Sequence, residues 1–206
     1  MNINFLERLM TNSPIRAFLQ KQVEGPRLRS MALKERYPIC LELGCGDGRG
    51  VQIITGLFGA EKVTATDIDP AQLDRARKRL LSEGHYEKRV QFRLESAMDL
   101  SIEPDGHYDA VFAFGVVHHT EDWRKAVREI KRVLKPGGEY FFDELLKGFL
   151  QSVPVRTATR HPEGGMFSAE EFTGYLLQSG FGLAGRWQWD GIWLLGSAVK
   201  QPSGSG

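Results

Sequence analysis

The sequence predicts an α/β fold in which helices cover a mostly parallel sheet. Apolar runs typical of buried strands alternate with amphipathic helical patterns between residues 39 and 145. A glycine-rich turn, Gly44–Gly50, follows the first of these runs, where a strand passes into a helix. Near the end of the chain, Asp190-Gly191 separates two more strand patterns and indicates an antiparallel hairpin.

Length and composition are those of one soluble domain. The 206 residues suffice for an α/β domain with a hydrophobic core. Lys plus Arg (27) nearly balances Asp plus Glu (26), which gives no sign of the basic face of a duplex nucleic-acid binder. No signal peptide and no long apolar run is present, so we expect a cytoplasmic protein without stable membrane insertion. Cys40 and Cys45 fall in a strand and in the glycine turn, which predicts packing rather than a disulfide or a metal site.

Residues 1–37 precede the first strand and are expected to form a helical cap. Apolar residues recur there at helical spacing, and Asn12-Ser13-Pro14 interrupts them. This pattern predicts two short amphipathic helices, the second with Pro14 at its first position. Three interpretations stay open: a cap packed on the sheet, a lid over an active site, or a surface that contacts lipid.

The glycine turn predicts a site for an anionic group. The strand Ile39–Leu43, the turn and the helix that follows would present backbone N–H groups and a helix N-terminus to such a group. Arg49 stands where a dinucleotide fingerprint needs its third glycine, and the Gly-Lys-Ser/Thr of a P-loop is missing. Glu42 inside the strand would repel a phosphate, so it suits a ligand that also carries positive charge.

Further elements follow in strand–helix order. The second strand, Val63–Asp67, ends in an acid roughly 20 residues beyond the glycine turn, where acids bond ribose hydroxyls in nucleotide-binding units. Asp69 and Pro70 predict the N-cap and first position of a helix over 71–82. Ser168, with Glu171 three residues later, predicts another helix start. The remaining predicted elements are strands at 90–94, 108–114, 139–144, 183–189 and 192–199, and a helix at 121–134.

Two motifs resemble those of a known family. Glu-Leu-Gly-Cys-Gly-Asp-Gly at 42–48, followed by Thr-Asp-Ile-Asp-Pro at 66–70, is similar to the first two motifs of class I S-adenosylmethionine-dependent methyltransferases. The resemblance covers residues 39–145 and continues more weakly to Lys200. It implies a three-layer Rossmann-like methyltransferase fold: a seven-stranded, mostly parallel sheet with an antiparallel last strand and an N-terminal helical cap. The expected organisation is a cap or lid at 1–37, an S-adenosylmethionine-binding domain at 38–200 and a flexible tail at 201–206.

The resemblance also implies a set of cofactor-binding residues. In this set Asp67 bonds the ribose, Ile68 packs on the adenine, and Phe114 lies beside the methionyl part of the cofactor. Since the family usually has an acid where Ser96 stands, Glu95, Asp99 or a backbone carbonyl would replace it here. The whole set is Glu42, Gly44, Cys45, Gly46, Asp67, Ile68, Ala97, Met98, Phe114 and Gly115.

Candidate catalytic residues lie beyond the fourth and fifth strands. His118 and His119 leave the end of the fourth strand, and each can be a general base or a structural group, with His119 preferred as base. By resemblance, Glu144 faces the active site and would hold a cationic substrate. The connection 145–167 has no periodic pattern and is interpreted as a substrate-facing insertion. Its Arg156, Arg160 and His161 would either bind an acidic or phosphorylated substrate or be solvated.

These inferences together predict an enzyme that transfers a methyl group by direct displacement from S-adenosylmethionine to a small-molecule acceptor, lipid-like or anionic, and releases S-adenosylhomocysteine. No Asn/Asp/Ser-Pro-Pro-Tyr/Phe motif follows the fourth strand, which disfavours methylation of base or glutamine amines. Two alternatives stay open: an enzyme of the same fold acting on protein or RNA, and a non-catalytic cofactor-binding subunit. The missing third glycine disfavours a nicotinamide oxidoreductase. The reacting atom (O, N, S or C) and the oligomeric state are not fixed by the sequence.

Overall fold

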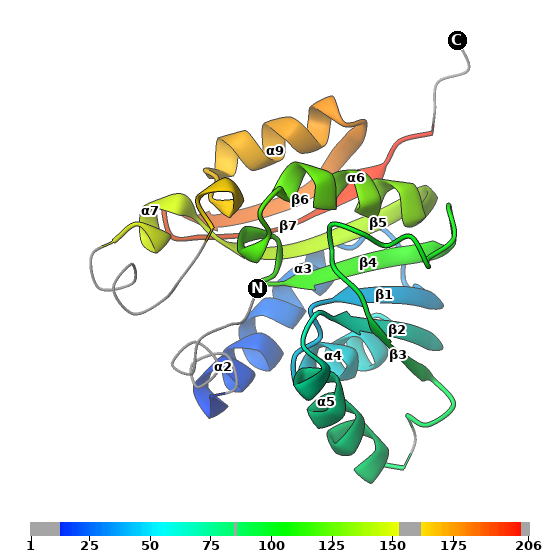
Figure 1. The fold of residues 1–206 in the computed structure, drawn as a ribbon. Helices are drawn as coiled ribbons and strands as arrows, with labels where there is room; N and C mark the ends of the chain where they lie inside the picture. The colour runs from blue at the N-terminus through cyan, green and yellow to red at the C-terminus, as the bar shows by residue number, and fades with distance from the viewer. Residues whose placement is uncertain (1–12, 85, 153–161, 203–206) are drawn as a thin grey trace.

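The computed structural model describes residues 13–84, 86–152 and 162–202, in which seven strands form one sheet (Figure 1). The strand order is β3-β2-β1-β4-β5-β7-β6. The pairings from β3 to β5 are parallel, and β7 runs antiparallel to both β5 and β6. This confirms the predicted mostly parallel sheet with an antiparallel last strand. The strands are β1 (Ile39–Leu43), β2 (Lys62–Asp67), β3 (Val90–Leu94), β4 (Tyr108–Phe114), β5 (Leu134–Leu145), β6 (Phe181–Trp189) and β7 (Trp193–Lys200).

Helices cover both faces of this sheet. In Figure 1, α6 and α9 lie on one face, and α3, α4 and α5 lie on the other. The α-helices are α2 (Pro14–Leu19), α3 (Gly25–Met31), α4 (Arg49–Leu57), α5 (Pro70–Ser82), α6 (Trp123–Val133), α7 (Lys147–Leu150) and α9 (Ala169–Gln178). A π-helix, η1 (Gln20–Glu24), joins α2 to α3, and the short 3₁₀ turns are η2 (Val117–His119) and η3 (Glu163–Gly165). No helix of these described ranges is long and apolar enough to cross a bilayer.

Each face of the sheet has its own hydrophobic core because side chains alternate along a strand. Phe141 and Phe142 are adjacent in β5, and each is completely buried, but they belong to different clusters. Phe141 packs on Phe58 with ring centroids 4.9 Å apart, and Phe142 packs on Phe172 at 5.2 Å. Burying one such side chain stabilises the fold by about 1.5–3 kcal/mol, so β5 ties both layers together.

Local signals in the sequence set most helix starts. The Ser13 hydroxyl accepts a hydrogen bond from the Arg16 amide at 3.1 Å, and α2 begins at Pro14 as predicted. Asp69 caps α5 by accepting from the Ala71 amide at 2.9 Å. Ser168 and Glu171 form the expected capping box of α9. The first of the two predicted N-terminal helices lies outside the described residues.

One strand begins earlier than predicted. β5 starts at Leu134, directly after α6, and not at Glu139. Leu134 pairs with Tyr108, and the register then shifts so that Glu139 pairs with Ala110. The Lys135–Gly138 stretch, which the sequence marks as a helix end, is therefore accommodated as an irregularity within the sheet.

Candidate active site

The glycine turn joins the C-terminal end of β1 to the start of α4 and is fixed by its neighbours. The Cys45 amide donates to the Thr66 carbonyl at 2.8 Å, and the Gly46 amide donates to Asp67 Oδ2 at 3.0 Å. Gly44 has a φ of +59°, and a Cβ there would lie 2.7 Å from a methyl carbon of Val116. A side chain would therefore be both strained and obstructed at this position.

Glu42 supplies a buried carboxyl group beneath this turn. Its residue is 2% exposed, and within the described residues its Oε2 has no hydrogen-bond partner. The start of α4 approaches so closely that a Cβ on Gly50 would overlap Glu42 Oε1. Burial raises the pKa of Glu42 well above its usual range, and the nearby Asp67 and Asp47 raise it further. A buried oxygen without a partner is costly, so this one suits a ligand that donates a hydrogen bond or carries positive charge.

Asp67 ends β2 and connects two turns. Its Oδ2 accepts from the Gly46 amide, and its Oδ1 accepts from the Asp69 amide at 2.9 Å. The residue is 8% exposed, and burial is the main cause that raises its pKa. The next residue, Ile68, is 47% exposed although it is apolar. The end of β2 thus offers a carboxylate and an apolar side chain at the same edge of the sheet.

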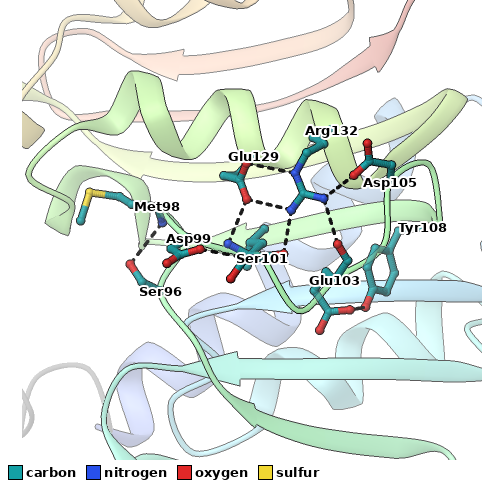
Figure 2. Close-up of polar contacts among 10 residues, drawn as sticks. Ser96, Met98, Asp99, Ser101, Glu103, Asp105, Tyr108, Glu129 and Arg132 are labelled. Carbon is teal, nitrogen blue, oxygen red and sulfur yellow. Dashed lines mark hydrogen bonds and ion pairs between the residues drawn. The ribbon is translucent and has the colours of Figure 1, made fainter.

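The loop after β3 carries Ala97 and Met98, and α6 holds it in place (Figure 2). Glu129 accepts from the Leu100 amide at 2.9 Å, and Arg132 donates to the Leu100 carbonyl at 2.7 Å. Arg132 also donates to the Glu103 carbonyl at 2.9 Å. These polar contacts help to set the path of the loop, and Leu100 also anchors it because its side chain is completely buried in the hydrophobic core.

Two acids of this loop were candidates to replace the acid missing at Ser96. Asp99 is exposed, and its Oδ1 accepts from the Ser101 amide at 3.2 Å. Glu95 is buried beside Glu103, and burial followed by the Glu103 charge raises its pKa. Ser96 itself accepts from the Met98 amide at 3.2 Å, so its hydroxyl shapes the turn (Figure 2).

The segment after β4 holds the two histidines in the 3₁₀ turn η2. His118 is 1% exposed, whereas His119 is partly exposed, and their ring centroids are 4.2 Å apart. The preceding Gly115 donates its amide to the Asp143 carbonyl at 2.6 Å, which ties this segment to β5. Only His119 thus combines its place at the sheet edge with access to solvent.

The Glu144 carboxyl group lies inside the protein, whereas an acid that holds a substrate would be accessible. It is completely buried and accepts from the Val117 amide at 3.0 Å and from the His118 amide at 3.2 Å. Its Oε2 also lies 2.6 Å from His118 Nδ1. Burial raises the pKa of Glu144 to about 8, against the lowering effect of these amides. The carboxyl group therefore anchors η2 from inside the protein.

One cavity brings five of the predicted cofactor residues together: Glu42, Gly44, Cys45, Gly46 and Phe114. Its volume is about 40 Å³, and Asp47, Arg49 and Gly50 also line it. Arg16 and Gln20 complete the lining from the N-terminal helical run. No group of three or more His, Cys, Asp or Glu side chains suited to a metal ion occurs in the part of the chain that the structure describes.

Arg16 is one of five cavity residues that sequence reasoning missed; the others are Gln20, Asp47, Arg49 and Gly50. The Arg16 guanidinium bonds Asp143 Oδ2 at 3.1 Å and also bonds Glu24. Several basic residues line the polar sides of the N-terminal pattern, and the pattern does not say which of them faces the sheet. Asp143 precedes Glu144 in β5, and its side chain points to the opposite face of the sheet. The pattern that predicts this strand does not indicate which of the two acids faces the cavity.

Residues 41–142 match a protein family described as a methyltransferase domain. The matched region extends from β1 into β5, so it includes the glycine turn, Asp67 and both histidines. A solved S-adenosylmethionine-dependent methyltransferase from Aquifex aeolicus has the same fold. It superimposes with a TM-score of 0.72 at 20% identity, over 94% of this chain and 96% of that one.

Two curated relatives are more similar in sequence over a shorter length. Methyltransferase GfsG of Streptomyces halstedii is 36% identical over 114 residues, which are 55% of this chain and 40% of that protein. Ubiquinone biosynthesis O-methyltransferase of Xanthomonas axonopodis pv. citri is 35% identical over 105 residues, 51% of this chain and 42% of that protein. The chain thus spans about two fifths of the length of the relatives that it matches.

Proposed function

This chain belongs to the class I S-adenosylmethionine-dependent methyltransferases, and we propose that it transfers a methyl group from that cofactor to a small-molecule acceptor. The proposal concerns the whole protein's activity, since the match to the named relatives covers only part of them. When bound, S-adenosylmethionine supplies an activated methyl group, so the protein's main task is to hold donor and acceptor in line.

The observation that carries the proposal is the partnerless oxygen of Glu42 beside the glycine turn. S-adenosylmethionine has an ammonium group from which this oxygen would accept a hydrogen bond. The positive charge of the ammonium would favour the ionised form of the carboxyl group. The cofactor's own carboxylate would lie against the backbone amides at the start of α4, where the helix dipole favours negative charge. A pyrophosphate would meet repulsion from Glu42 in the same place.

The rest of the cofactor would extend along the sheet edge toward β2 and β3. Each carboxylate oxygen has a second lone pair, so Asp67 can hold the glycine turn and still accept from ribose hydroxyls. The exposed Ile68 would cover one side of the adenine, and the loop that contains Ala97 and Met98 would cover the other. The methionyl part would lie near Phe114 and Gly115.

The acceptor would approach over η2, where His119 is our candidate general base. A base is needed only if the acceptor atom starts protonated, as in a hydroxyl group. In this proposal His118 and Glu144 position the turn and do not touch the substrate, because both are buried. If His119→Ala retained full turnover, this assignment would be removed.

A small-molecule acceptor is favoured over a macromolecule by two considerations. One of the relatives is named for ubiquinone biosynthesis, which involves a small molecule, and for methylation at oxygen. In addition, a cationic surface for protein or RNA would need free basic side chains in the N-terminal run. Arg27 instead stacks on Trp187 at 4.6 Å, and Arg29 donates to the Lys34 and Glu35 carbonyls at 3.0 Å. Whether the acceptor is anionic stays a prediction, since Arg156, Arg160 and His161 lie outside the described residues.

Calorimetric titration tests the proposal directly. Wild-type protein should bind S-adenosylmethionine and S-adenosylhomocysteine but not NAD. Glu42→Gln keeps the shape of the side chain and removes its charge, so it should weaken binding by about 1.5–3 kcal/mol, as losing a charge-assisted hydrogen bond does.

The matched control is Glu61→Gln, because Glu61 is an exposed acid that pairs with Arg36 on the surface. This variant should bind with wild-type affinity. Equal affinities for wild type and Glu42→Gln would remove the assignment of Glu42, and binding of NAD in place of the sulfonium cofactor would refute the proposed function.

A further inference from the structure

A second cavity lies at the turn between β6 and β7, and its lining residues all differ from those of the cavity at the glycine turn. The start of α7, the first turn of α9 and the β6–β7 turn surround it, and Figure 1 shows these three at the same end of the sheet. Its volume is about 190 Å³. Since an apolar cavity of about 150 Å³ in another protein binds benzene, this cavity is large enough for a compact organic molecule.

The walls of this second cavity are joined through their backbones. The Leu146 amide donates to the Ile192 carbonyl at 2.9 Å, and the Phe149 amide donates to the Gly191 carbonyl at 2.8 Å. A Cβ on Gly148 would lie 2.6 Å from the same Gly191 oxygen, so α7 contacts the turn directly. Because these contacts do not depend on side-chain rotamers, the cavity has a defined shape before any ligand binds.

The lining of the second cavity is acidic. Glu170 and Asp190 line it from the exposed surface, and no Lys, Arg or His occurs among its described lining residues. Lys147 is adjacent in sequence to two of the lining residues but does not line the cavity. The N-terminus of α9 also borders the cavity, but Glu170 and Glu171 in its first turn offset the positive end of the helix dipole. The second cavity therefore favours a ligand with positive charge.

Gln188 adds an acceptor that lacks a donor. Its Nε2 donates to Asp190 Oδ1 at 2.7 Å, and this contact fixes which end of the amide faces the carboxylate. Its Oε1 is buried and has no hydrogen-bond partner among the residues that the structure describes. Buried polar atoms are normally paired, so this oxygen suits a ligand that donates a hydrogen bond. Leu146 and Ala169 line the same cavity and are buried apolar residues, which suit a hydrocarbon group.

We propose that the second cavity binds a compact primary amine in its protonated form. An ammonium group has three N–H donors and no acceptor, and it would donate to Gln188 Oε1 and pair with Asp190 and Glu170. The hydrocarbon part of the amine would pack on Leu146 and Ala169. The inference goes beyond the proposed function, because this site shares no residue with the cavity assigned to the cofactor.

A nuclear magnetic resonance titration with cyclohexylamine tests the site in the full chain at pH 7 and constant ionic strength. The amine is protonated there, as a lysine side chain is. The backbone amide signals of Ala169 and Gly191 should shift and saturate. Cyclohexanol has nearly the same size but no charge, so it should bind about tenfold more weakly, as expected when a charge-assisted hydrogen bond is lost.

Asp190→Asn is the main variant, because Asn-Gly favours the same hairpin turn as Asp-Gly and the fold is kept. It should weaken binding of cyclohexylamine about tenfold and leave binding of cyclohexanol unchanged. Glu170→Gln should change the two affinities in the same direction. The matched control is Asp74→Asn, since Asp74 is an exposed acid on α5 that pairs with Arg77. This control should bind both compounds as wild type does.

Three results would overturn the amine site. The first is equal affinity of wild type for cyclohexylamine and cyclohexanol. The second is wild-type affinity for the amine in both Asp190→Asn and Glu170→Gln, or shifts that do not include Ala169 and Gly191. The third is tighter binding of cyclohexanecarboxylate than of the amine, which would show that the N-terminus of α9 selects an anion instead. The readout needs neither methyl transfer nor cofactor, so failure of the proposed function would leave this test unaffected.

Discussion

Two arginines of nearly equal exposure hold segments against the rest of the domain, but they do so differently. The Arg132 side chain is 29% exposed and donates to the backbone carbonyls of Leu100 and Glu103. It also pairs with the Glu129 and Asp105 carboxylates. The Arg16 side chain is 27% exposed and binds the side chains of Glu24 and Asp143. An arginine on main-chain carbonyls fixes the path of a segment, whereas an ion pair between side chains can exchange partners. The loop after β3 is thus held along its backbone, whereas α2 is held through ion pairs between side chains.

Glu144→Gln should have the largest effect, because it acts on the fixed side at a completely buried anchor. The oxygen of Gln can accept from only one of the Val117 and His118 amides. Its NH₂ group would then face the other amide, and neither of these two donors would have an acceptor. We expect the free energy of unfolding to fall by about 3 kcal/mol at pH 5, measured by urea denaturation.

The difference in free energy of unfolding between wild type and Glu144→Gln should depend on pH. The pKa of Glu144 is raised to about 8, so its protonated form stabilises the fold, and this stability is lost as pH rises from about 4.5 to about 8. The difference between wild type and Glu144→Gln should therefore shrink between pH 5 and pH 9. A difference that grows with pH would show that Glu144 is ionised in the folded protein.

Arg132→Ala should have the next largest effect. It removes two hydrogen bonds from a charged group to the loop backbone, together with the ion pairs to Glu129 and Asp105. The free energy of unfolding should fall by about 2 kcal/mol, mainly through the lost backbone bonds. Arg128→Ala is the control, since Arg128 lies on the same helix and pairs with Asp122 at 3.6 Å in an exposed position. Its cost should be below about 1 kcal/mol. Equal costs for the two variants would mean that the loop is not held by Arg132.

Arg16→Ala should have the smallest effect on stability, although it lies at the cavity. Burial, followed by the nearby Asp143 charge, raises the pKa of Glu24 to about 9, so a protonated Glu24 can donate a hydrogen bond to Asp143 in place of Arg16. The free energy of unfolding should therefore fall by only about 1 kcal/mol. The same urea denaturation measures it beside Arg132→Ala. A cost above that of Arg132→Ala would mean that the ion pairs of Arg16 stabilise the fold more than the backbone contacts of Arg132 do, and would contradict the contrast between the two segments.

Much of the fold was predictable because its signals are local. The strands β3 and β4 begin and end where their apolar patterns do, and the caps Asp69 and Ser168 act within three residues of themselves. The early start of β5 was not predictable, because it depends on pairing between Leu134 and the distant Tyr108. Register across a sheet is a long-range property that no short window of sequence contains.

The candidate site divides in the same way. The glycine turn and the acid after β2 are short-range motifs, and the structure places Glu42, Gly46 and Asp67 beside one another. The direction of Glu144 depends on alternation along β5, which gives Asp143 one face and Glu144 the other. Arg16 lies 127 positions before its partner Asp143, so that contact exists only once the chain has folded.

A crystal structure with S-adenosylhomocysteine bound tests the central claim most directly. We expect the ligand's amino group within about 3 Å of the free oxygen of Glu42 and its ribose hydroxyls on Asp67. A ligand held elsewhere, or a glycine turn that instead takes a pyrophosphate-bearing molecule, would contradict the account.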